Sequence, residues 1–427
     1  MKSTQIRSVC ARQILDCKGK PMVEVDVLTE GGMLGRAASP SGVSAGMHEA
    51  FVLRDGDPKQ YGGLSVYKAV DLVHQVIAPA LKGMDILDQR KIDETLIDLD
   101  GTENKSYLGG NTLYSVSLAC IRAAAQTLNL PLYQHLASKE IRTIPLPTVN
   151  CISGGSYQKG SMPFQECTIV PYKAQSIQEA VQIIWGVFQE TPKVIQEYQK
   201  GAPPKPGSLS GWQSPVPDPM VAFDLLWEAA SRCGFQDKIA FAADCAANEF
   251  YNSERNTYDL VTEEVDLDGL LGRIKDLTDK YNFLYIEDPV QEDDWEGWQK
   301  ASKVLDKTIL VGDDFTVTNI QRLKKAYETE ACGGFIFKPN QVGTVTECLL
   351  AHEFAQNHGM LTIPSIRAGG AIDDAIFDMA VAFGAPCTKQ GPPKNGERVY
   401  GINFLSRVAD LYPEAKPYDF TPHVKFK

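Results

Sequence analysis

The chain has 427 residues, of which 43% are apolar and 22% charged, values typical of a globular protein with more than one domain. Its 54 acidic and 42 basic residues give a formal net charge of −12. This charge argues against a general nucleic-acid binder and against docking on an anionic membrane. A local basic pocket for a small anionic substrate remains compatible with it.

The sequence carries no sign of export or membrane insertion. It has no continuous apolar run near its start and no stretch of about 18 apolar residues elsewhere. Its ten cysteines are scattered and form no CxxC pair. We therefore expect a cytoplasmic protein with reduced thiols and without a zinc ribbon.

The N-terminal region opens with a strand pattern. Val23, Val25 and Val27 alternate with acidic residues, so they should share one face of a strand. A Gly/Ser-rich loop, SPSGVSAGMHEA, follows, and helical patterns then run to about residue 137. The stretch TIPLPTVN contains Pro145 and Pro147 and reads as a hinge.

These patterns predict an α+β domain over residues 1–140 and a different domain over residues 141–427. In the second domain, five short apolar runs each end in a polar residue, namely Asp244, Glu287, Asp313, Lys338 and Arg367. The intervals between these residues are 43, 26, 25 and 29, with helical patterns in between. Strands that alternate with helices at this spacing predict a βα barrel, in which these side chains would share the catalytic face.

The start of this second domain departs from the βα rhythm. The runs TVNCIS and QECTIVP both read as strands, but only about a dozen residues separate them. Such a gap is too short for a helical crossover, so the barrel should begin with an antiparallel hairpin.

Asp244, Glu287 and Asp313 form a set of oxygen ligands at successive strand ends. Such a set, without histidine or cysteine, suits a hard divalent cation, and Mg²⁺ is the natural choice. Any one of these acids could equally be a helix cap. Three in succession favour the metal site.

Lys338 and Lys389 supply the other half of a possible reaction centre. A lysine beside a metal ion and a second lysine should shift toward its neutral form, which can take a proton from carbon. The metal would stabilise the enediolate that forms when a carboxylate substrate loses its α-proton. The alternative for Lys389 is a solvated surface lysine.

The residues described so far, with their neighbours, resemble those of the enolase family over nearly the whole chain. The matching segments are RQILDCKGKPMVEVDV, SGVSAGMHEAFVLRDGD, DGTENKSYLGGN, FAADCAANEFY, YIEDPVQEDDWEGW, VGDDFTVTN and KPNQVGT. The resemblance implies an N-terminal α+β domain and a C-terminal ββαα(βα)6 barrel. It also implies an Mg²⁺-dependent, cytoplasmic enzyme that forms a homodimer or a higher oligomer.

The resemblance also implies roles for single residues. The first metal site would be Asp244, Glu287 and Asp313, and Ser44 would help to hold a second, substrate-linked metal. Lys338 would be the base, with Lys389 on the substrate carboxylate. The remaining positions expected at the substrate are Gln165, the catalytic Glu166, Arg367 as the phosphate ligand, and Ser41.

Several positions depart from the family pattern. Tyr157 and Ile366 replace two active-site histidines, and Ala368 replaces a phosphate-contacting serine. Trp212 stands where the pattern places the glutamate that protonates the leaving hydroxyl. Tyr157, Trp212 and Ile366 would then line a pocket for a larger or less polar substituent.

Asp218 could replace the missing acid if the proline-rich loop around it folds differently. That loop could be a substrate lid or a rigid surface loop.

We therefore expect a divergent enolase-family enzyme, a carbon–oxygen lyase that acts on a small anionic carboxylate that can carry a phosphate. One alternative is a true enolase, which converts 2-phosphoglycerate to phosphoenolpyruvate with a relocated acid. Another is a catalytically inactive homologue. Nucleic acid and membrane are not expected partners.

Overall fold

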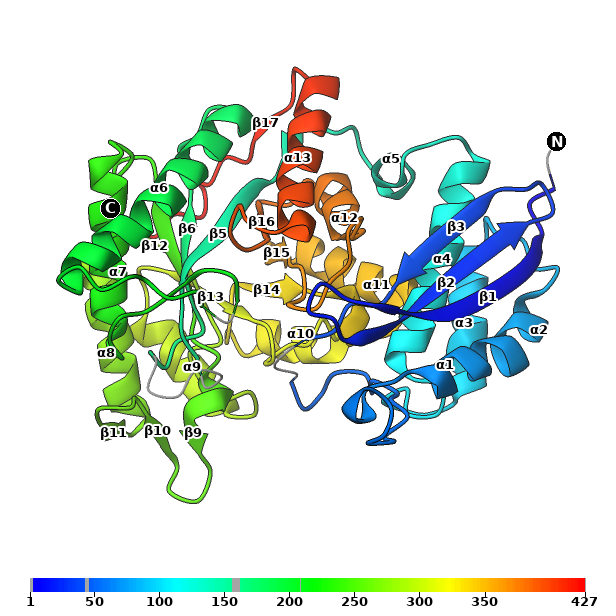
Figure 1. Cartoon of the computed structure of the whole chain (residues 1–427), viewed down its shortest axis with the longest axis horizontal. Coiled ribbons are helices and arrows are strands. Elements are labelled where there is room, and N and C mark those ends of the chain that lie inside the picture. The colour runs from blue at the N-terminus through cyan, green and yellow to red at the C-terminus, as the bar shows by residue number, and fades with distance from the viewer. Residues whose placement is uncertain (1–2, 43–45, 156–161, 208, 427) are drawn as a thin grey trace.

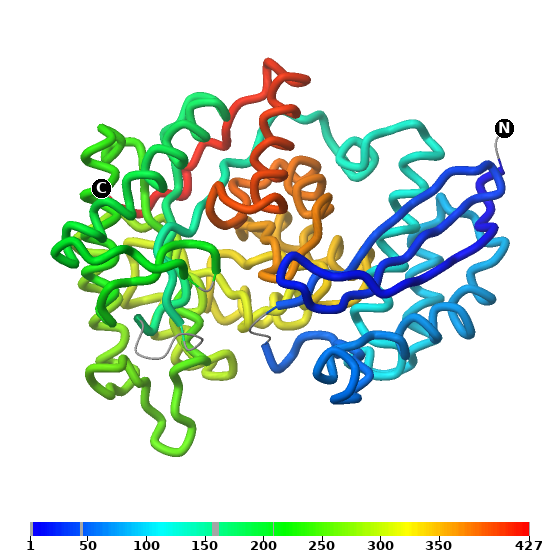
Figure 2. Tube along the Cα trace, in the orientation of Figure 1, coloured from blue at the N-terminus to red at the C-terminus, as the bar shows by residue number. Residues whose placement is uncertain are grey.

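The structure, a computed structural model, describes residues 3–42, 46–155, 162–207 and 209–426. An N-terminal α+β region and a C-terminal barrel lie side by side along the long axis (Figure 1). The two ends of the chain lie at opposite ends of that axis (Figure 2).

The N-terminal region is a three-stranded antiparallel sheet covered by helices. Its strands are β1 (Ile6–Leu15), β2 (Pro21–Thr29) and β3 (Leu34–Ala38). The predicted alternation is confirmed, because Val23, Val25 and Val27 are fully buried on one face of β2. The helices are α1 (Tyr67–Leu72), α2 (Ala78–Leu81), α3 (Gln89–Asp100), α4 (Gly110–Thr127) and α5 (Leu132–Leu136).

Small residues let α4 lie directly on the sheet. A side chain at Gly35 of β3 would put its Cβ 2.0 Å from the Ala119 carbonyl oxygen and 2.5 Å from the Ala123 nitrogen. Only glycine therefore fits at this contact between the sheet and the helix.

Among the described residues, eight strands form the ring of the barrel. They are β5 (Leu146–Ser153), β6 (Glu166–Val170), β8 (Ala240–Asp244), β12 (Phe283–Glu287), β13 (Ile309–Gly312), β14 (Gly334–Phe337), β15 (Leu361–Pro364) and β16 (Cys387–Lys389). The short strand β7 (Trp212–Gln213) pairs with one of them, β5. The order of pairing is β15-β14-β13-β12-β8-β6-β5-β16, and a bridge between Ser365 and Lys389 closes the ring. Nearly every residue of these strands is buried, as expected for a sheet covered by helices.

The barrel opens with the predicted hairpin. Strands β5 and β6 pair antiparallel, and β6 also pairs antiparallel with β8. Two helices follow in succession, α6 (Ile177–Tyr198) and α7 (Pro219–Arg232). Six βα units then end in α8 (Leu267–Lys280), α9 (Trp295–Val304), α10 (Ile320–Glu328), α11 (Val345–Asn357), α12 (Ile376–Phe383) and α13 (Gly396–Leu411). The predicted ββαα(βα)6 order is confirmed.

The reversed strand has a direct effect on the site. Parallel strands deliver the residues at their carboxyl ends to the catalytic face of a barrel. Because β6 runs the other way, its first residue, Glu166, lies opposite Asp244, the last residue of β8. Residues from both kinds of strand therefore meet at one end of the barrel.

Several short pairings complete the structure. The loop after β8 carries a small sheet of β9 (Tyr251–Asn252), β10 (Thr257–Asp259) and β11 (Glu264–Val265), while β4 (Thr143–Ile144) pairs with β17 (Lys416–Pro417). The proline stretch that reads as a hinge is largely barrel strand β5, in which Pro147 pairs with Thr388. Within the described residues, no helix is long and apolar enough to cross a membrane.

Candidate active site

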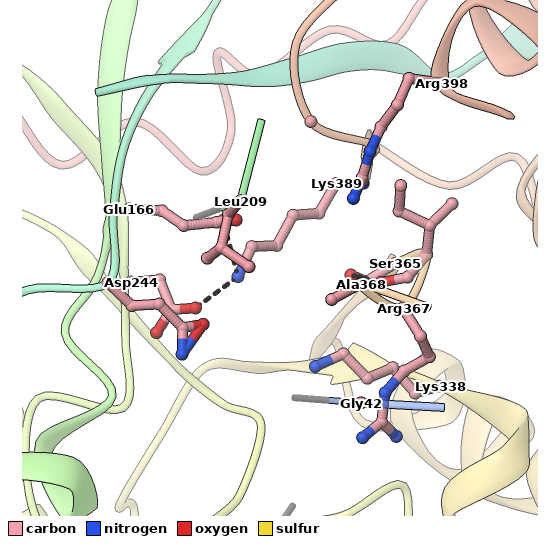
Figure 3. A pocket seen from close by; sticks show the side chains of 13 residues that line it. Gly42, Glu166, Leu209, Asp244, Lys338, Ser365, Arg367, Ala368, Lys389 and Arg398 are labelled. Carbon is pink, nitrogen blue, oxygen red and sulfur yellow. Dashed lines mark hydrogen bonds and ion pairs between the residues drawn. The ribbon is translucent and has the colours of Figure 1, made fainter. Parts of the chain in front are cut away.

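The polar residues at the strand ends surround one cavity at the mouth of the barrel. Glu166, Asp244, Lys338 and Lys389 line this cavity with Arg398, which comes from the first turn of α13 (Figure 3). Two lysines and two carboxylates thus share one cavity. Of these five side chains, the strand-end argument from the sequence named Asp244 and Lys338, while Lys389 was left open by the spacing and Glu166 came from the family resemblance.

Lys389 is the centre of the carboxylate cluster. Its Nζ lies 2.7 Å from Asp244 Oδ2, 2.6 Å from Glu287 Oε2 and 3.2 Å from Glu166 Oε2. The Lys389 residue is only 8% exposed, so it is not the solvated surface lysine of the alternative interpretation. Burial alone would lower the pKa of Lys389, but Asp244, Glu166 and Glu287 outweigh it and raise that pKa well above its ordinary value.

Lys338 follows β14 and forms an ion pair with Asp313, which follows β13. Burial favours the neutral form of Lys338, but the negative charge of Asp313 outweighs it and raises the pKa of the amine. The lowered pKa expected from the sequence concerns a Lys338 that lies beside a bound metal ion and a second lysine, so it stays a prediction. Among the protein's own groups, the carboxylate of Asp313 is the charged partner that sets the direction of this pKa.

The three predicted metal ligands lie at the ends of adjacent strands. Glu287 pairs in register with Asp244 on β8 and with Val311 on β13, two residues before Asp313. Burial, followed by the charge of Asp244, raises the pKa of Glu287 well above its ordinary value. Such close buried carboxylates repel one another and need a positive partner.

One observation tests whether a metal fits these residues. The Oε1 atom of Glu287 is buried and has no hydrogen-bond partner among the described residues. A buried carboxylate oxygen left without a donor calls for a ligand, and an all-oxygen donor set suits Mg²⁺. The predicted residues therefore fit a magnesium ion.

A second group of acids lies beside this set. Asp288, Asp313 and Asp314 can bring one oxygen each within 4.8 Å of one another, so they could hold a metal ion, whereas the predicted set of Asp244, Glu287 and Asp313 does not come this close together. Asp288 accepts hydrogen bonds from the backbone N–H groups of Asp313 (2.9 Å) and Asp314 (2.8 Å). Both of its oxygens thus fix the loop that carries Asp313, a role in orienting the predicted ligand.

The predicted phosphate ligand, Arg367, is already paired. Its two terminal nitrogens donate to both oxygens of Glu49, at 3.0 Å and 3.1 Å, in the bidentate geometry that makes such pairs strong. Glu49 also accepts from Gln341, which in turn donates to Asp313 at 2.9 Å. A loop of the N-terminal region thereby connects to the metal site of the barrel.

The other predicted positions differ in how they meet the cavity. Gln165 and Ile366 line it directly. Ser41 is not among the lining residues, although the next residue, Gly42, is; its backbone bridges to Gly369, and its hydroxyl donates to Asp16 at 3.5 Å. Ser44 and Tyr157 lie outside the described residues.

The proline-rich loop meets the cavity through a residue that the sequence analysis did not select. Leu209, which is 6% exposed, lines the cavity. The prediction for Trp212 is not supported, because its ring packs instead on Phe188 of α6, with centroids 6.1 Å apart. Asp218 caps α7 by accepting from the Met220 N–H, and it lines a different pocket.

Four residues of this site escaped the sequence analysis. Glu49 and Gln341 belong to the quoted segments SGVSAGMHEAFVLRDGD and KPNQVGT, so only their contacts were missed. Arg398 follows Lys389 by nine residues at a helix start, and Leu209 lies three residues before Trp212. No periodic pattern marks either of these two.

This fold and this site define a barrel protein with an added α+β region and a strand-end centre of carboxylates and lysines. The family description "Enolase, C-terminal TIM barrel domain" matches residues 141–425, and "Enolase, N-terminal domain" matches residues 6–136. The chain therefore belongs to the enolase family.

Named relatives cover nearly the whole chain. The sequence is 41% identical to the enolase of Methanopyrus kandleri over 409 residues, which is 95% of this chain and 96% of that protein. It is also 41% identical to the enolases of Methanococcus aeolicus and of Methanococcus maripaludis strain C5, with 96% of each chain covered.

Proposed function

We propose that this chain is an Mg²⁺-dependent enzyme that removes the α-proton of a small anionic carboxylate and then breaks a carbon–oxygen bond. The observation that carries this proposal is that Lys389, which is buried, and Lys338, which is mostly buried, line one cavity and pair with the strand-end carboxylates Asp244, Glu287 and Asp313. Such a set suits enolisation, since it offers a base and positive charge for the enediolate.

The residues divide the work as follows. The Lys338 Nζ is the base that accepts the α-proton, and the Lys389 ammonium balances the negative charge that develops on the substrate carboxylate. Mg²⁺ held by Asp244, Glu287 and Asp313 would neutralise the charge that raises the pKa of Lys338 and would polarise the substrate carboxylate. Glu166 orients the Lys389 amine from the reversed strand β6.

The cavity lining also contains an apolar part. It consists of Leu209, Ile366 and Ala368, and none of these side chains can donate a proton to a leaving group. A positioned general acid typically contributes about 10²–10⁴ in rate, so expulsion of hydroxide would be slow in this cavity. We therefore favour a substrate other than 2-phosphoglycerate, in which the departing or retained group is less polar or leaves without a proton.

A second candidate is the dehydration of 2-phosphoglycerate by a relocated acid. The 41% identity to proteins named enolase supports it. Our proposal also includes a cytoplasmic location and assembly into a homodimer or a higher oligomer. It divides the chain into one domain over residues 1–140 and another over residues 141–427.

The test is exchange of the α-proton of 2-phosphoglycerate in D₂O with Mg²⁺, followed by NMR, together with an assay for phosphoenolpyruvate. We expect exchange with little product, and loss of exchange in Lys338→Ala. The matched control is Lys303→Ala, which removes an exposed lysine at the end of α9. Product formed in step with exchange would support the second candidate.

Absence of exchange with 2-phosphoglycerate moves the same test to a panel of 2-hydroxycarboxylates. If none of them exchanges, the proposed enolisation is wrong and the inactive homologue is supported.

A further inference from the structure

The cavity contains a cation that the proposed reaction does not use. Arg398 lies in the first turn of α13 and is only 5% exposed, yet it lines the same cavity as Lys338 and Lys389. A buried guanidinium is costly unless its N–H groups are satisfied. The contacts of Arg398 therefore show whether it serves only the fold.

The protein satisfies this guanidinium incompletely. One terminal nitrogen donates to the Gln390 carbonyl at 3.2 Å. The Nε atom is buried and has no hydrogen-bond partner among the described residues. Its nearest acid, Glu397, lies 3.6 Å away, beyond hydrogen-bond distance. Buried N–H groups in native proteins are almost always paired, so an unpaired one at a cavity points to a ligand.

The backbone makes room for Arg398 beside the cavity. Gly391 also lines the cavity, and a Cβ at this position would lie 2.8 Å from a terminal nitrogen of Arg398. Gly391 has a φ of +73°, which favours glycine. The strand end that carries Lys389 therefore turns so that the guanidinium can lie across it.

Arg398 keeps its positive charge. Burial lowers the pKa of Arg398, and Glu166 and Glu397 oppose that change. The ordinary pKa of arginine lies so far above neutrality that the group stays ionised at pH 7.

Arg367, the arginine expected to bind a phosphate, differs from Arg398 in its hydrogen bonds. Arg367 is bound on both terminal nitrogens by Glu49, so an incoming anion must compete with a bidentate carboxylate. Arg398 enters the cavity from one side, and Arg367 with Lys338 lies on the other (Figure 3). A molecule that spans the cavity from Lys338 would meet Arg398 at its far end.

We propose that Arg398 binds a second oxyanion on the substrate, a carboxylate or a phosphate group, in addition to the carboxylate that is enolised. The substrate is then a small acid with at least two anionic groups, one at each side of the cavity. This inference rests on the proposed function for the location of the reacting carboxylate, and it adds the residue that selects the substrate.

The test measures binding by calorimetry with Mg²⁺ and needs no turnover. The probes are glycerate, with one anionic group, malate, with two carboxylates, and 2-phosphoglycerate, with a carboxylate and a phosphate. We expect the wild-type chain to bind malate or 2-phosphoglycerate at least about tenfold more tightly than glycerate, since charge-assisted hydrogen bonds are the strong ones. Whichever of the two binds more tightly identifies the second group.

Two substitutions locate the second anion. In Arg398→Met, the affinity for the dianionic probe should fall at least about tenfold while that for glycerate changes less than about twofold, and Arg398→Lys should lie between them. In Arg367→Met, the preference for the dianion should persist. Wild-type protein that does not prefer either dianion, or a preference lost in Arg367→Met but kept in Arg398→Met, overturns the proposal.

An equal loss for all three probes in Arg398→Met also overturns it, because that result indicates a packing role. If Arg398→Met does not fold, Arg398→Lys and the wild-type preference still decide. Failure of the proposed reaction would instead appear as missing α-proton exchange with this binding pattern intact.

Discussion

Two parts of the cavity lining are built on opposite rules. In the charged part, Lys338 and Lys389 lie next to opposite charges at hydrogen-bond distance. The apolar part consists of Leu209, Ile366 and Ala368, and none of these side chains can donate a proton. Under the proposed function, the charged part would remove the α-proton, and the apolar part offers no acid for a leaving hydroxyl.

The largest effect is expected when a charge is removed from the charged part of the lining, around Lys338 and Lys389. Glu287→Gln removes a carboxylate whose Oε1 is left without a donor and whose Oε2 pairs with Lys389. We expect the Mg²⁺ affinity, measured by calorimetry, to fall about 100-fold or more and α-proton exchange to fall about 10³-fold. Glu263→Gln, at an exposed ion pair with Arg273, is the control. Unchanged Mg²⁺ affinity in Glu287→Gln would exclude this carboxylate as a ligand.

A half-buried titratable group outside the cavity, His352, tests whether a charge can be held inside the protein without a counter-charge. His352 stacks on Phe383 and contacts the Thr362 hydroxyl at 3.1 Å, and burial lowers its pKa to about 4. In the unfolded chain the pKa of the His352 imidazole is near 6.5, so as the pH falls the unfolded chain is protonated at His352 before the folded protein is. The stability that comes from neutral His352 is therefore complete above about pH 6.5 and is lost toward pH 4, by about 3 kcal/mol in all.

The measurement is urea unfolding of the wild-type chain and of His352→Gln at pH 7 and pH 5. We expect the wild-type free energy of unfolding to fall by about 2 kcal/mol more than that of the variant across this interval. Parallel changes in the two proteins would mean that His352 is protonated in the fold.

A second experiment adds an acidic side chain to the apolar part of the lining, to test whether a missing proton donor limits the reaction. In Leu209→Glu, burial should raise the pKa of the new carboxyl group, which would then carry a proton to give to a leaving hydroxyl. We expect phosphoenolpyruvate formation from 2-phosphoglycerate to rise about tenfold, less than an evolved acid achieves. Trp212→Glu, in the same loop but packed on Phe188, should give no gain. A gain in Trp212→Glu alone would restore the sequence-based assignment.

The smallest expected effect is on stability, and it concerns the contact between Lys394 and the ring of Trp212. The Lys394 amine lies 5.3 Å from the centre of the Trp212 ring. Lys394→Ala should lower the free energy of unfolding by about 0.5 kcal/mol and leave α-proton exchange unchanged, because this contact supports the fold rather than the cavity. Denaturation followed by tryptophan fluorescence measures the first effect, and Lys394→Arg should keep the contact.

Residues at the ends of regular strands could be predicted from the sequence. Asp244 and Glu287 each end a strand, and Asp313 and Lys338 each follow one directly, so strand spacing predicts that they share one face. Lys389 also ends a strand, but the spacing did not exclude a solvated surface position for it. The antiparallel opening was also predictable, since the short gap between β5 and β6 excludes a crossover.

Residues in irregular loops could not be predicted in the same way. The loop between α6 and α7 contains five prolines and no hydrophobic period that would fix its path. A hydrogen bond from the Gly207 N–H to the Gly211 carbonyl sets its turn, and Leu209 rather than Trp212 then points to the cavity. The link from Glu49 to Arg367 joins positions 318 residues apart, for which sequence spacing gives no signal.

That link has a consequence for movement. Glu49 belongs to the N-terminal region and Arg367 to the barrel, so a motion that separates the two parts would also separate this ion pair. When the two parts are separated, Arg367 would lose the negative charge of Glu49, and the mouth of the barrel would become more positive. When the two parts are together, the ion pair neutralises this positive charge. Opening of the molecule would thus change the electrostatic field that an approaching anion meets, and the arrival of an anion at Arg367 would in turn favour the open form.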